Sequence, residues 1–328
     1  MTEGSFPKAN GDVLYASEIS KVFYGKFGQK TFGTGSDGAL HVTSGTTTIA
    51  APIMQYTSLT VDAGTVLTWS TYGKLIVFVQ GDMTINGTIT IPARVGSFPT
   101  GWDIPTGTEY SKTAAAGLGA HFVIVPFPFV PVETPKGNNS SNASAVNHDG
   151  GAGGSSYGAG GDGADGGDGT GNAQTTNSNG GVGKAGVLFI VGGNVSFGAA
   201  SAVNGTGGTG SNGTSWTYGS SGGGGGGSGA IIGVFSGGNC TLATGAAITL
   251  NGGAGGTGAY EASYDGWSGG GGGGGGGFVV MACAGTMSNS STVSVAGGAG
   301  GASGGEHTAG SNGNSGASLF YSLTYSYP

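Results

Sequence analysis

The side chains that could carry acid–base or nucleophilic chemistry are few and scattered. Histidine adjoins an acidic residue twice, at His148-Asp149 and at Glu306-His307. Nucleophilic catalysis needs a base within hydrogen-bond reach of the nucleophile, and acid–base hydrolysis of a glycan needs converging carboxylates. Neither pair lies beside a Ser or Cys in a nucleophile-elbow context, and no motif pairs two of the 16 acidic residues. We therefore predict no catalytic residues and a protein that is not an enzyme.

A second group of acidic residues could bind a metal. Asp162, Asp165 and Asp168 recur in the glycine-rich stretch 158–171, GAGGDGADGGDGTG. Calcium prefers oxygen ligands, and glycine–aspartate nonapeptides bind it in parallel β-rolls. The full nonapeptide is absent, as is the glutamate of an EF-hand, so a solvated acidic turn is favoured and calcium stays an open alternative. The glycine runs also lack the Lys-Ser/Thr of a phosphate loop. We predict no cofactor and no metal site.

Large aromatic rings lie in the glycine-rich loops. Such rings offer contact area at low side-chain entropy cost, as in binding paratopes, and could stack on sugars or dock on a receptor. The alternative is that they pin the loops by packing on glycine strands or at subunit contacts. The candidate receptor-binding residues are Trp102, Tyr110, Trp216, Tyr218, Tyr260, Tyr264 and Trp267.

The composition restricts the class of protein. Glycine makes up 79 of 328 residues, while 36% of residues are hydrophobic and 8% are charged. Disordered chains are poor in apolar residues and rich in charge, and collagen has glycine at every third position throughout, so both are excluded. The net charge of −7 without a basic patch argues against nucleic-acid binding. A solenoid or β-rich fibre remains.

The sequence also bears on the compartment. It has no apolar run of membrane-spanning length, and residues 1–19 lack the basic and apolar regions of a signal peptide. Cys240 and Cys283 do not form a disulfide framework, and we expect them to be small buried residues in a reduced core. A chain made in a reducing cytosol with the composition of an extracellular fibre is typical of a virion protein.

Apolar runs recur at a nearly constant spacing. VLFIVGG at 187–193, IGVFSGG at 232–238 and VVMACAG at 279–285 align with offsets of 45 and 47 residues. A fourth copy is LIVFVQG at 75–81, and SLFYSLTYSYP at 318–328 is a final half-copy. Each unit continues into two short alternating runs and a glycine-rich loop. We expect these loops, including the runs 222–227 and 269–277, to leave one face of the scaffold, and they could adopt polyglycine II.

These patterns predict an all-β fold, with a β-helix or stacked-strand scaffold built from repeats of about 46 residues. Asn86-Gly87 between alternating runs indicates a hairpin or a corner between coils. Residues 16–23 are the best helix candidate. Prolines exclude the apolar segment 122–132 from a central strand, so we expect it along an edge or against another subunit. Three parts are expected: an attachment segment 1–40, a strand-rich domain 41–135 and a glycine-rich repeat domain 136–328.

Two stretches carry a family resemblance. GDVLYASEISKVFYGKFG near the N-terminus, and KLIVFVQGDMTINGTITI followed by copies with GG-x-GG loops, resemble glycine-rich tail-fibre adhesins of bacteriophages. Some of those adhesins fold into a polyglycine sandwich with longer glycine blocks, whereas this chain keeps apolar strands between its glycines. The resemblance implies a virion location and a homotrimer. It also implies attachment to other virion proteins through 1–40 and binding to a host glycan or outer-membrane protein. The alternative is a purely structural capsid or tail decoration protein.

Overall fold

The computed structural model describes residues 32–70, 74–93, 178, 180–216, 219–261 and 266–322. These residues form three parallel six-stranded sheets and two short antiparallel hairpins, and they contain no helix. The predicted all-β stacked-strand scaffold is therefore confirmed, whereas the helix candidate 16–23 lies outside the described residues. Within those residues, no helix long and apolar enough to cross a membrane is found.

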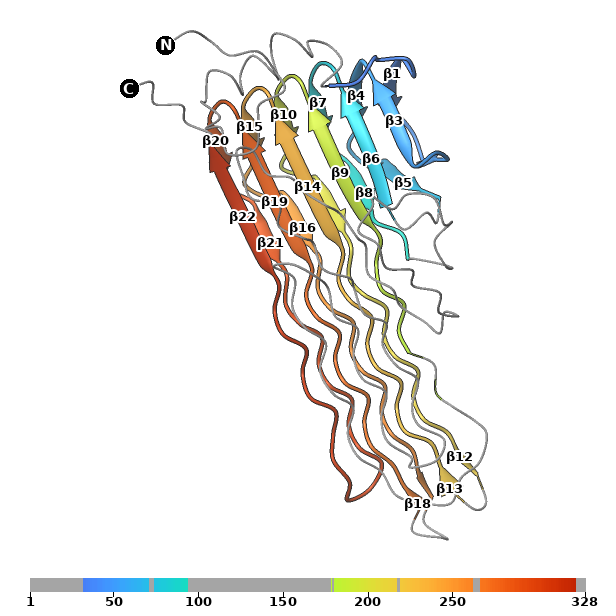
Figure 1. Ribbon diagram of the computed structural model, residues 1–328. Helices are drawn as coiled ribbons and strands as arrows, with labels where there is room; N and C mark the ends of the chain where they lie inside the picture. Colours follow the sequence, from blue (N-terminus) through green and yellow to red (C-terminus); the bar gives the residue numbers. More distant parts are fainter. Residues whose placement is uncertain are drawn as a thin grey trace, which may run out of the picture.

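Each sheet takes one strand from every turn of the chain, which we call a coil (Figure 1). Sheet A is formed by β1 (Ala39–Val42), β4 (Ser58–Val61), β7 (Met83–Ile85), β10 (Val195–Phe197), β15 (Cys240–Leu242) and β20 (Met287–Asn289). Sheet B is formed by β2 (Thr46–Ile49), β5 (Val66–Trp69), β8 (Thr88–Thr90), β11 (Ala202–Asn204), β16 (Ala247–Thr249) and β21 (Thr292–Ser294). Sheet C is formed by β3 (Ile53–Tyr56), β6 (Lys74–Val79), β9 (Gly186–Val191), β14 (Ile231–Ser236), β19 (Phe278–Cys283) and β22 (Ala317–Ser322).

The chain passes from sheet A to sheet B to sheet C within a coil and then begins the next coil. Asn86-Gly87 is a corner rather than a hairpin turn, because β7 and β8 belong to different sheets. Gly87 is required there, since a Cβ atom would lie 2.6 Å from the carbonyl oxygen of Thr65 and closer still to that of Asp62. Successive coils stack in register.

The parallel pairing aligns the apolar runs. In sheet C, Val187 lies opposite Ile232, and Ile232 opposite Val279. The same sheet pairs Leu75 with Val187 across the long stretch of chain between them. Sheet C therefore runs through both of the domains expected from sequence, because β6 lies in the range 41–135 and its neighbour β9 lies in the range 136–328.

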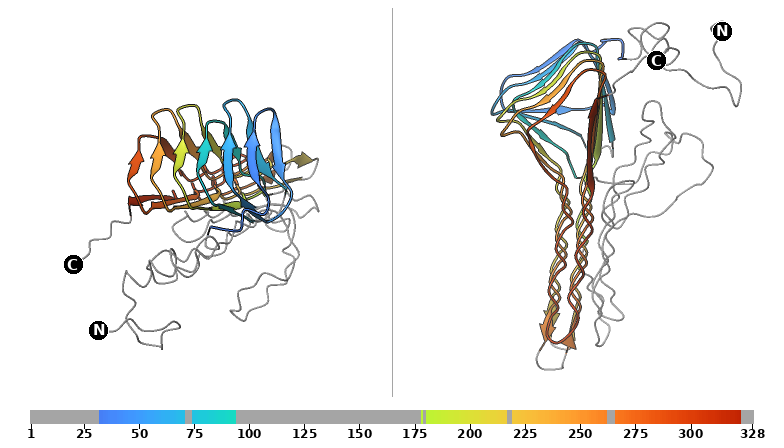
Figure 2. Two further views of the ribbon diagram at one scale, coloured as in Figure 1. Left: turned by 90° about the horizontal axis from the view of Figure 1, so that it is seen from above. Right: turned by 90° about the vertical axis from the view of Figure 1, so that its left-hand side faces the viewer.

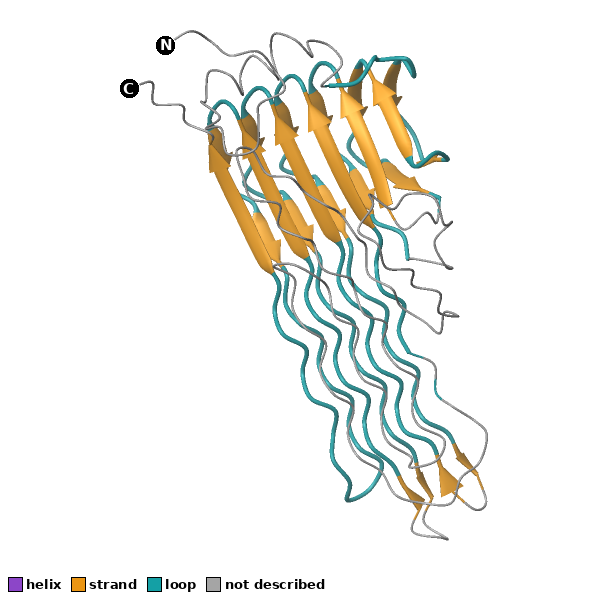
Figure 3. Cartoon of the chain, viewed as in Figure 1, coloured by secondary structure: helices purple, strands orange, loops and turns teal. Residues whose placement is uncertain are grey.

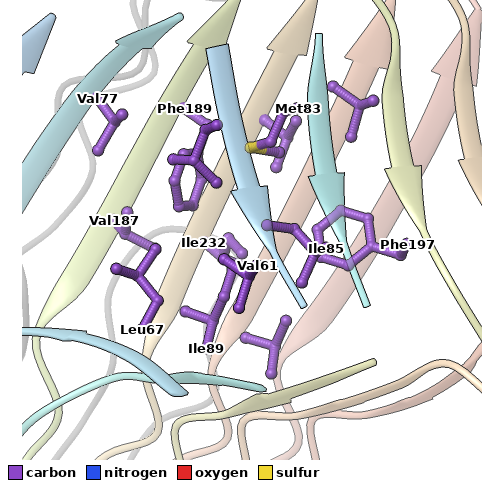
Figure 4. Packing of buried hydrophobic residues seen from close by; sticks show 14 of the residues in the cluster. Val61, Leu67, Val77, Met83, Ile85, Ile89, Val187, Phe189, Phe197 and Ile232 are labelled. Carbon is purple, nitrogen blue, oxygen red and sulfur yellow. The ribbon is translucent and has the colours of Figure 1, made fainter. Parts of the chain in front are cut away.

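Alternation along the strands sends every second side chain into a shared core between the three sheets. Phe189, Phe197 and Leu67 are among its largest fully buried members, and Figure 4 shows how such side chains from different sheets meet. Burying one large aliphatic or aromatic side chain stabilises the fold by roughly 1.5–3 kcal/mol. This core therefore supplies the main stabilisation of the coil stack.

Aspartate and asparagine side chains link successive coils at the corner between sheets C and A. Asp82 Oδ1 accepts a hydrogen bond from the Asn194 amide N–H at 2.7 Å. Asn194 Oδ1 accepts from Asn239 N–H at 2.9 Å, and Asn239 Oδ1 accepts from Thr286 N–H at 2.8 Å. We call Asp82, Asn194 and Asn239 the corner ladder. It satisfies backbone donors that no strand partner reaches.

The two cysteines lie in the core and are free thiols. Both are fully buried, in agreement with the expected role as small core residues. Burial, and then the neighbouring Cys283 thiol, raise the pKa of Cys240 to about 12. The thiolate form needed for nucleophilic chemistry is thus suppressed at neutral pH.

Candidate functional site

Glycine-rich segments extend from one end of the coil stack as a separate bundle (Figures 1 and 2). Three outgoing segments leave sheet B at 205–214, 250–259 and 295–303. Four returning segments enter sheet C at 180–185, 221–230, 268–277 and 310–316. We call these seven segments the glycine bundle. Figure 2 shows them as two layers, and Figure 3 shows that the strands are confined to the coil stack and the far tip of the bundle.

Backbone hydrogen bonds hold the bundle together with a period of three residues. Within the outgoing layer, Gly207, Gly210 and Gly213 donate to the carbonyl groups of residues 251, 254 and 257 at 2.7–2.9 Å. Between the layers, Gly224 donates to Ser211 and Gly227 to Gly208, both at 2.8 Å. Each segment therefore bonds to neighbours in more than one direction, as a β-strand does not.

The absence of side chains makes this spacing possible. A Cβ atom added to Gly226 would lie 2.6 Å from the carbonyl carbon of Gly253 and 2.8 Å from the carbonyl oxygen of Ala254. It would approach the oxygen of Gly253 still more closely. Real Cβ atoms are essentially never found within 3.0 Å of another heavy atom in this way. The packing of the bundle thus selects glycine by steric exclusion.

Two short hairpins close the bundle at its far end. The first joins β12 (Ser215–Trp216) to β13 (Gly219–Ser220), and Trp216 pairs with Gly219. The second joins β17 (Tyr260–Glu261) to β18 (Gly266–Trp267), and Tyr260 pairs with Trp267. The two hairpins contact each other. We call this pair the tip.

Serine side chains anchor the hairpins to the bundle. Ser221 Oγ accepts a hydrogen bond from the Thr214 amide at 2.9 Å, directly below the first hairpin. Ser268 Oγ donates to the Ser221 carbonyl at 2.9 Å and so ties the second hairpin to the first. Sequence analysis missed these residues, although each stands immediately before a long glycine run. These bonds connect both hairpins to the glycine bundle.

Three of the aromatic residues proposed from sequence lie at this tip. The strands bring Trp216, Tyr260 and Trp267 together on neighbouring hairpins, and the Tyr260 side chain is 47% exposed. Among the described residues, Tyr260 and Leu319 are large hydrophobic residues whose side chains are exposed. Several residues proposed from sequence lie outside the described residues: Trp102, Tyr110, Tyr218, Tyr264, the His148-Asp149 pair, the segment 122–132 and the aspartates Asp162, Asp165 and Asp168.

In the described part of the chain, the two histidine–acid pairs lie in different regions. Glu306 and His307 lie in the turn beyond Gly304, which bridges to Ser268 near the tip. His41 Nε2 contacts the Asp62 carboxylate at 3.0 Å, but both side chains are exposed and lie in the first two coils. The described residues contain no cluster of three His, Cys, Asp or Glu side chains suited to a metal ion.

No protein-family model, curated protein or solved structure matches the chain. The candidate site consists of two neighbouring hairpins that carry aromatic residues and are held by serine hydrogen bonds at the end of the glycine bundle.

Proposed function

We propose that the protein is a fibre or tail-tip component of a bacteriophage virion that binds a host-cell surface receptor through the tip of the glycine bundle. The observation that carries this proposal is the gathering of Trp216, Tyr260 and Trp267 on two adjacent hairpins. The Tyr260 ring is 47% exposed, and an exposed aromatic ring suits recognition because it loses little side-chain entropy on binding.

The placement of the first described residues supports the same function. Phe32 lies beside Gly192 and Gly237 at the corner between sheets C and A, at the end of sheet C opposite the bundle (Figure 1). Attachment near that end would leave the tip free to reach a cell surface. We further propose that the glycine segments adopt polyglycine II, whose rise of ~3.1 Å per residue would place the tip roughly 30 Å beyond sheet B.

We also propose that the coils carrying these segments are copies of one unit of about 46 residues. The register of Val187, Ile232 and Val279 in sheet C supports this. Residues 1–40 would join other virion proteins, and the fibre would be a homotrimer. Sedimentation of the purified chain tests the trimer.

Receptor binding is tested with the full chain, fluorescently labelled and mixed with a panel of bacterial strains. We expect saturable binding to the cells of some strains and a loss of at least tenfold in affinity for Tyr260→Ala. Leu319→Ala is the matched control, because Leu319 is 46% exposed but lies on β22, away from the tip. The control should bind like the wild type.

Two outcomes would contradict receptor binding. One is wild-type protein that binds no cell of any strain; the other is equal loss of binding for Tyr260→Ala and Leu319→Ala. Either result would favour a structural component of the particle, whose glycine segments pack only against their neighbours.

A further inference from the structure

The outer face of sheet C differs from the outer faces of the other two sheets. Sheets A and B turn mostly Ser and Thr outward, for example Thr241 in β15 and Thr249 in β16. Sheet C turns large apolar residues outward, among them Leu188, Phe235 and Tyr321. An apolar face of this extent marks a surface that is covered in the native protein.

Several outward-facing residues of β14 and β19 are themselves buried. Ile231, Phe278 and Val280 alternate with core residues and therefore point outward, yet they are only 1%, 8% and 3% exposed. Neighbours on the same face can shield the sides of such residues but not their ends. The low exposure of these three residues favours a second layer over this part of the sheet. The burial is found in a single chain, which favours a segment of this chain over a second copy as the cover.

The glycine bundle continues this covered face. In the returning segment 221–230, the backbone N–H groups fall into three sets, each with a period of three residues. The set that begins at Gly223 donates to the next returning segment, and the set that begins at Gly224 donates to the outgoing layer. The remaining positions are Gly222, Gly225 and Ser228. Their amides donate no backbone hydrogen bond within the described residues. They are nevertheless buried. Buried backbone donors are almost always paired.

The side chain of Ser228 gives a second sign of the same cover. Its hydroxyl is fully buried and has no hydrogen-bond partner among the described residues. The outward positions of the next returning segment, Gly269, Gly272 and Gly275, are likewise buried and carry no side chain. A smooth glycine surface with free donors matches a neighbouring backbone that offers carbonyl groups.

One segment of the chain begins and ends beside this surface. The chain leaves the described part at Ala93, which bridges to Lys184 just before β9. It re-enters at Ser178, whose Oγ donates to the Asn212 carbonyl at 3.1 Å close to the tip. The ends of the segment 94–177 therefore lie at the base and near the tip of the returning layer.

We propose that the segment 94–177 forms a third layer, in which the apolar run 122–132 covers the outer face of sheet C and the glycine run 150–171 covers the returning layer of the bundle. The run FVIVPFPFVPV supplies apolar side chains, and its prolines suit a segment that lies across a sheet rather than within it. In the glycine run, glycine stands at 160, 163, 166 and 169. That period of three is the period of the bundle's hydrogen bonds.

The occupant is identified by photo-crosslinking in the full chain. Phe127 is replaced by p-benzoyl-phenylalanine, and the irradiated protein is analysed by peptide mass spectrometry after mixing isotopically light and heavy chains. We expect crosslinks to β9, β14 or β19 within one chain. The same photoreactive residue at Thr241, on the outer face of sheet A, should capture no peptide from 94–177.

Three outcomes would overturn the proposal: crosslinks that join light to heavy chains, crosslinks confined to residues 1–31, or no crosslink into sheet C. The first would make the face an interface between copies, and the second would make the N-terminal segment the cover.

Amide hydrogen exchange tests the glycine part of the layer. Gly163→Ala would push a methyl group toward the returning layer and should speed exchange of the amides in 222–229 at least tenfold. Asp165→Ala is the control, because residue 165 falls at a different position of the three-residue period. Equal exchange in 222–229 for both variants and the wild type would refute the third layer over the bundle.

Discussion

A single methyl group in the middle of the glycine bundle tests the steric basis of its packing. We consider Gly226→Ala in the returning segment 221–230. The new Cβ atom would meet the carbonyl groups of Gly253 and Ala254, which are backbone atoms and cannot rotate away. The segment must shift as a whole, and its neighbours are held on both sides.

The expected loss of stability can be assembled from the contacts. Overpacking typically costs ~1–3 kcal/mol, and the upper end applies where the obstacle is backbone. The shift would also weaken two 2.8 Å hydrogen bonds, from Gly226 to Gly272 and from Gly253 to Gly227, each contributing about 1 kcal/mol. Alanine is less flexible than glycine in the unfolded chain, which offsets about 0.5–1 kcal/mol of this loss of stability. We therefore expect Gly226→Ala to destabilise the protein by about 4 kcal/mol.

The free energy of unfolding is measured by chemical denaturation of the full chain, with amide exchange in the bundle as a second readout. Gly64→Ala is the control for the substitution itself. A Cβ atom at Gly64 has nothing within 4 Å, and only its φ of +78° opposes alanine, which should cost about 1–2 kcal/mol. A loss below about 1 kcal/mol for Gly226→Ala, or a larger loss for Gly64→Ala, would refute steric selection of glycine.

Three further predictions concern the coil stack. Asn239→Ala should lower the free energy of unfolding by about 0.5–1.5 kcal/mol in denaturant titrations, because the side-chain acceptor for the exposed Thr286 N–H is lost; Asn289→Ala, which removes only local bonds from Ser291, should lower it less. Burial, and then Asp37, raise the pKa of Tyr56 above 10.0, so the neutral phenol stabilises the fold below pH 10 and this stabilisation is lost as the pH rises further; the loss should shrink in Tyr56→Phe, and an unchanged pH profile would argue against it. Cys240 and Cys283 should react with a thiol reagent at pH 8 only after unfolding, and rapid labelling of native protein would contradict their burial.

Sequence reasoning located the strands of sheet C because their apolar runs are long and evenly spaced. The run at 187–193 aligns with 232–238 by inspection, and β9 does pair with β14 in that register. The role of Asn86-Gly87 could not be decided, since the same dipeptide suits a hairpin and a corner. The choice depends on whether β7 and β8 pair with each other or with distant coils, which local sequence does not encode.

At the tip, too, the sequence predicted the individual residues but not the contacts between distant parts of the chain. Aromatic residues in glycine-rich loops marked Trp216, Tyr260 and Trp267 as candidates, but not their meeting on two hairpins. That meeting depends on bonds such as Ser268 Oγ to the Ser221 carbonyl, which join loops 47 residues apart. The outward-facing apolar residues of sheet C were also hidden, because a strand buried on both faces shows no alternation.

The number of glycines in each triplet of the bundle follows the number of neighbours of each segment. The returning segment 268–277, which has segments beside it on both sides and another layer across, is glycine at every position after Ser268. The outgoing segment 295–303 keeps glycine at two positions of three and places Ala296, Ala299 and Ala302 on its exposed side. The last returning segment, at the edge, keeps only Gly310, Gly313 and Gly316. Glycine is thus present where a neighbouring backbone excludes Cβ, and other residues appear where a face is open. By this rule an all-glycine segment has no open face, which independently favours a third layer over the returning segments.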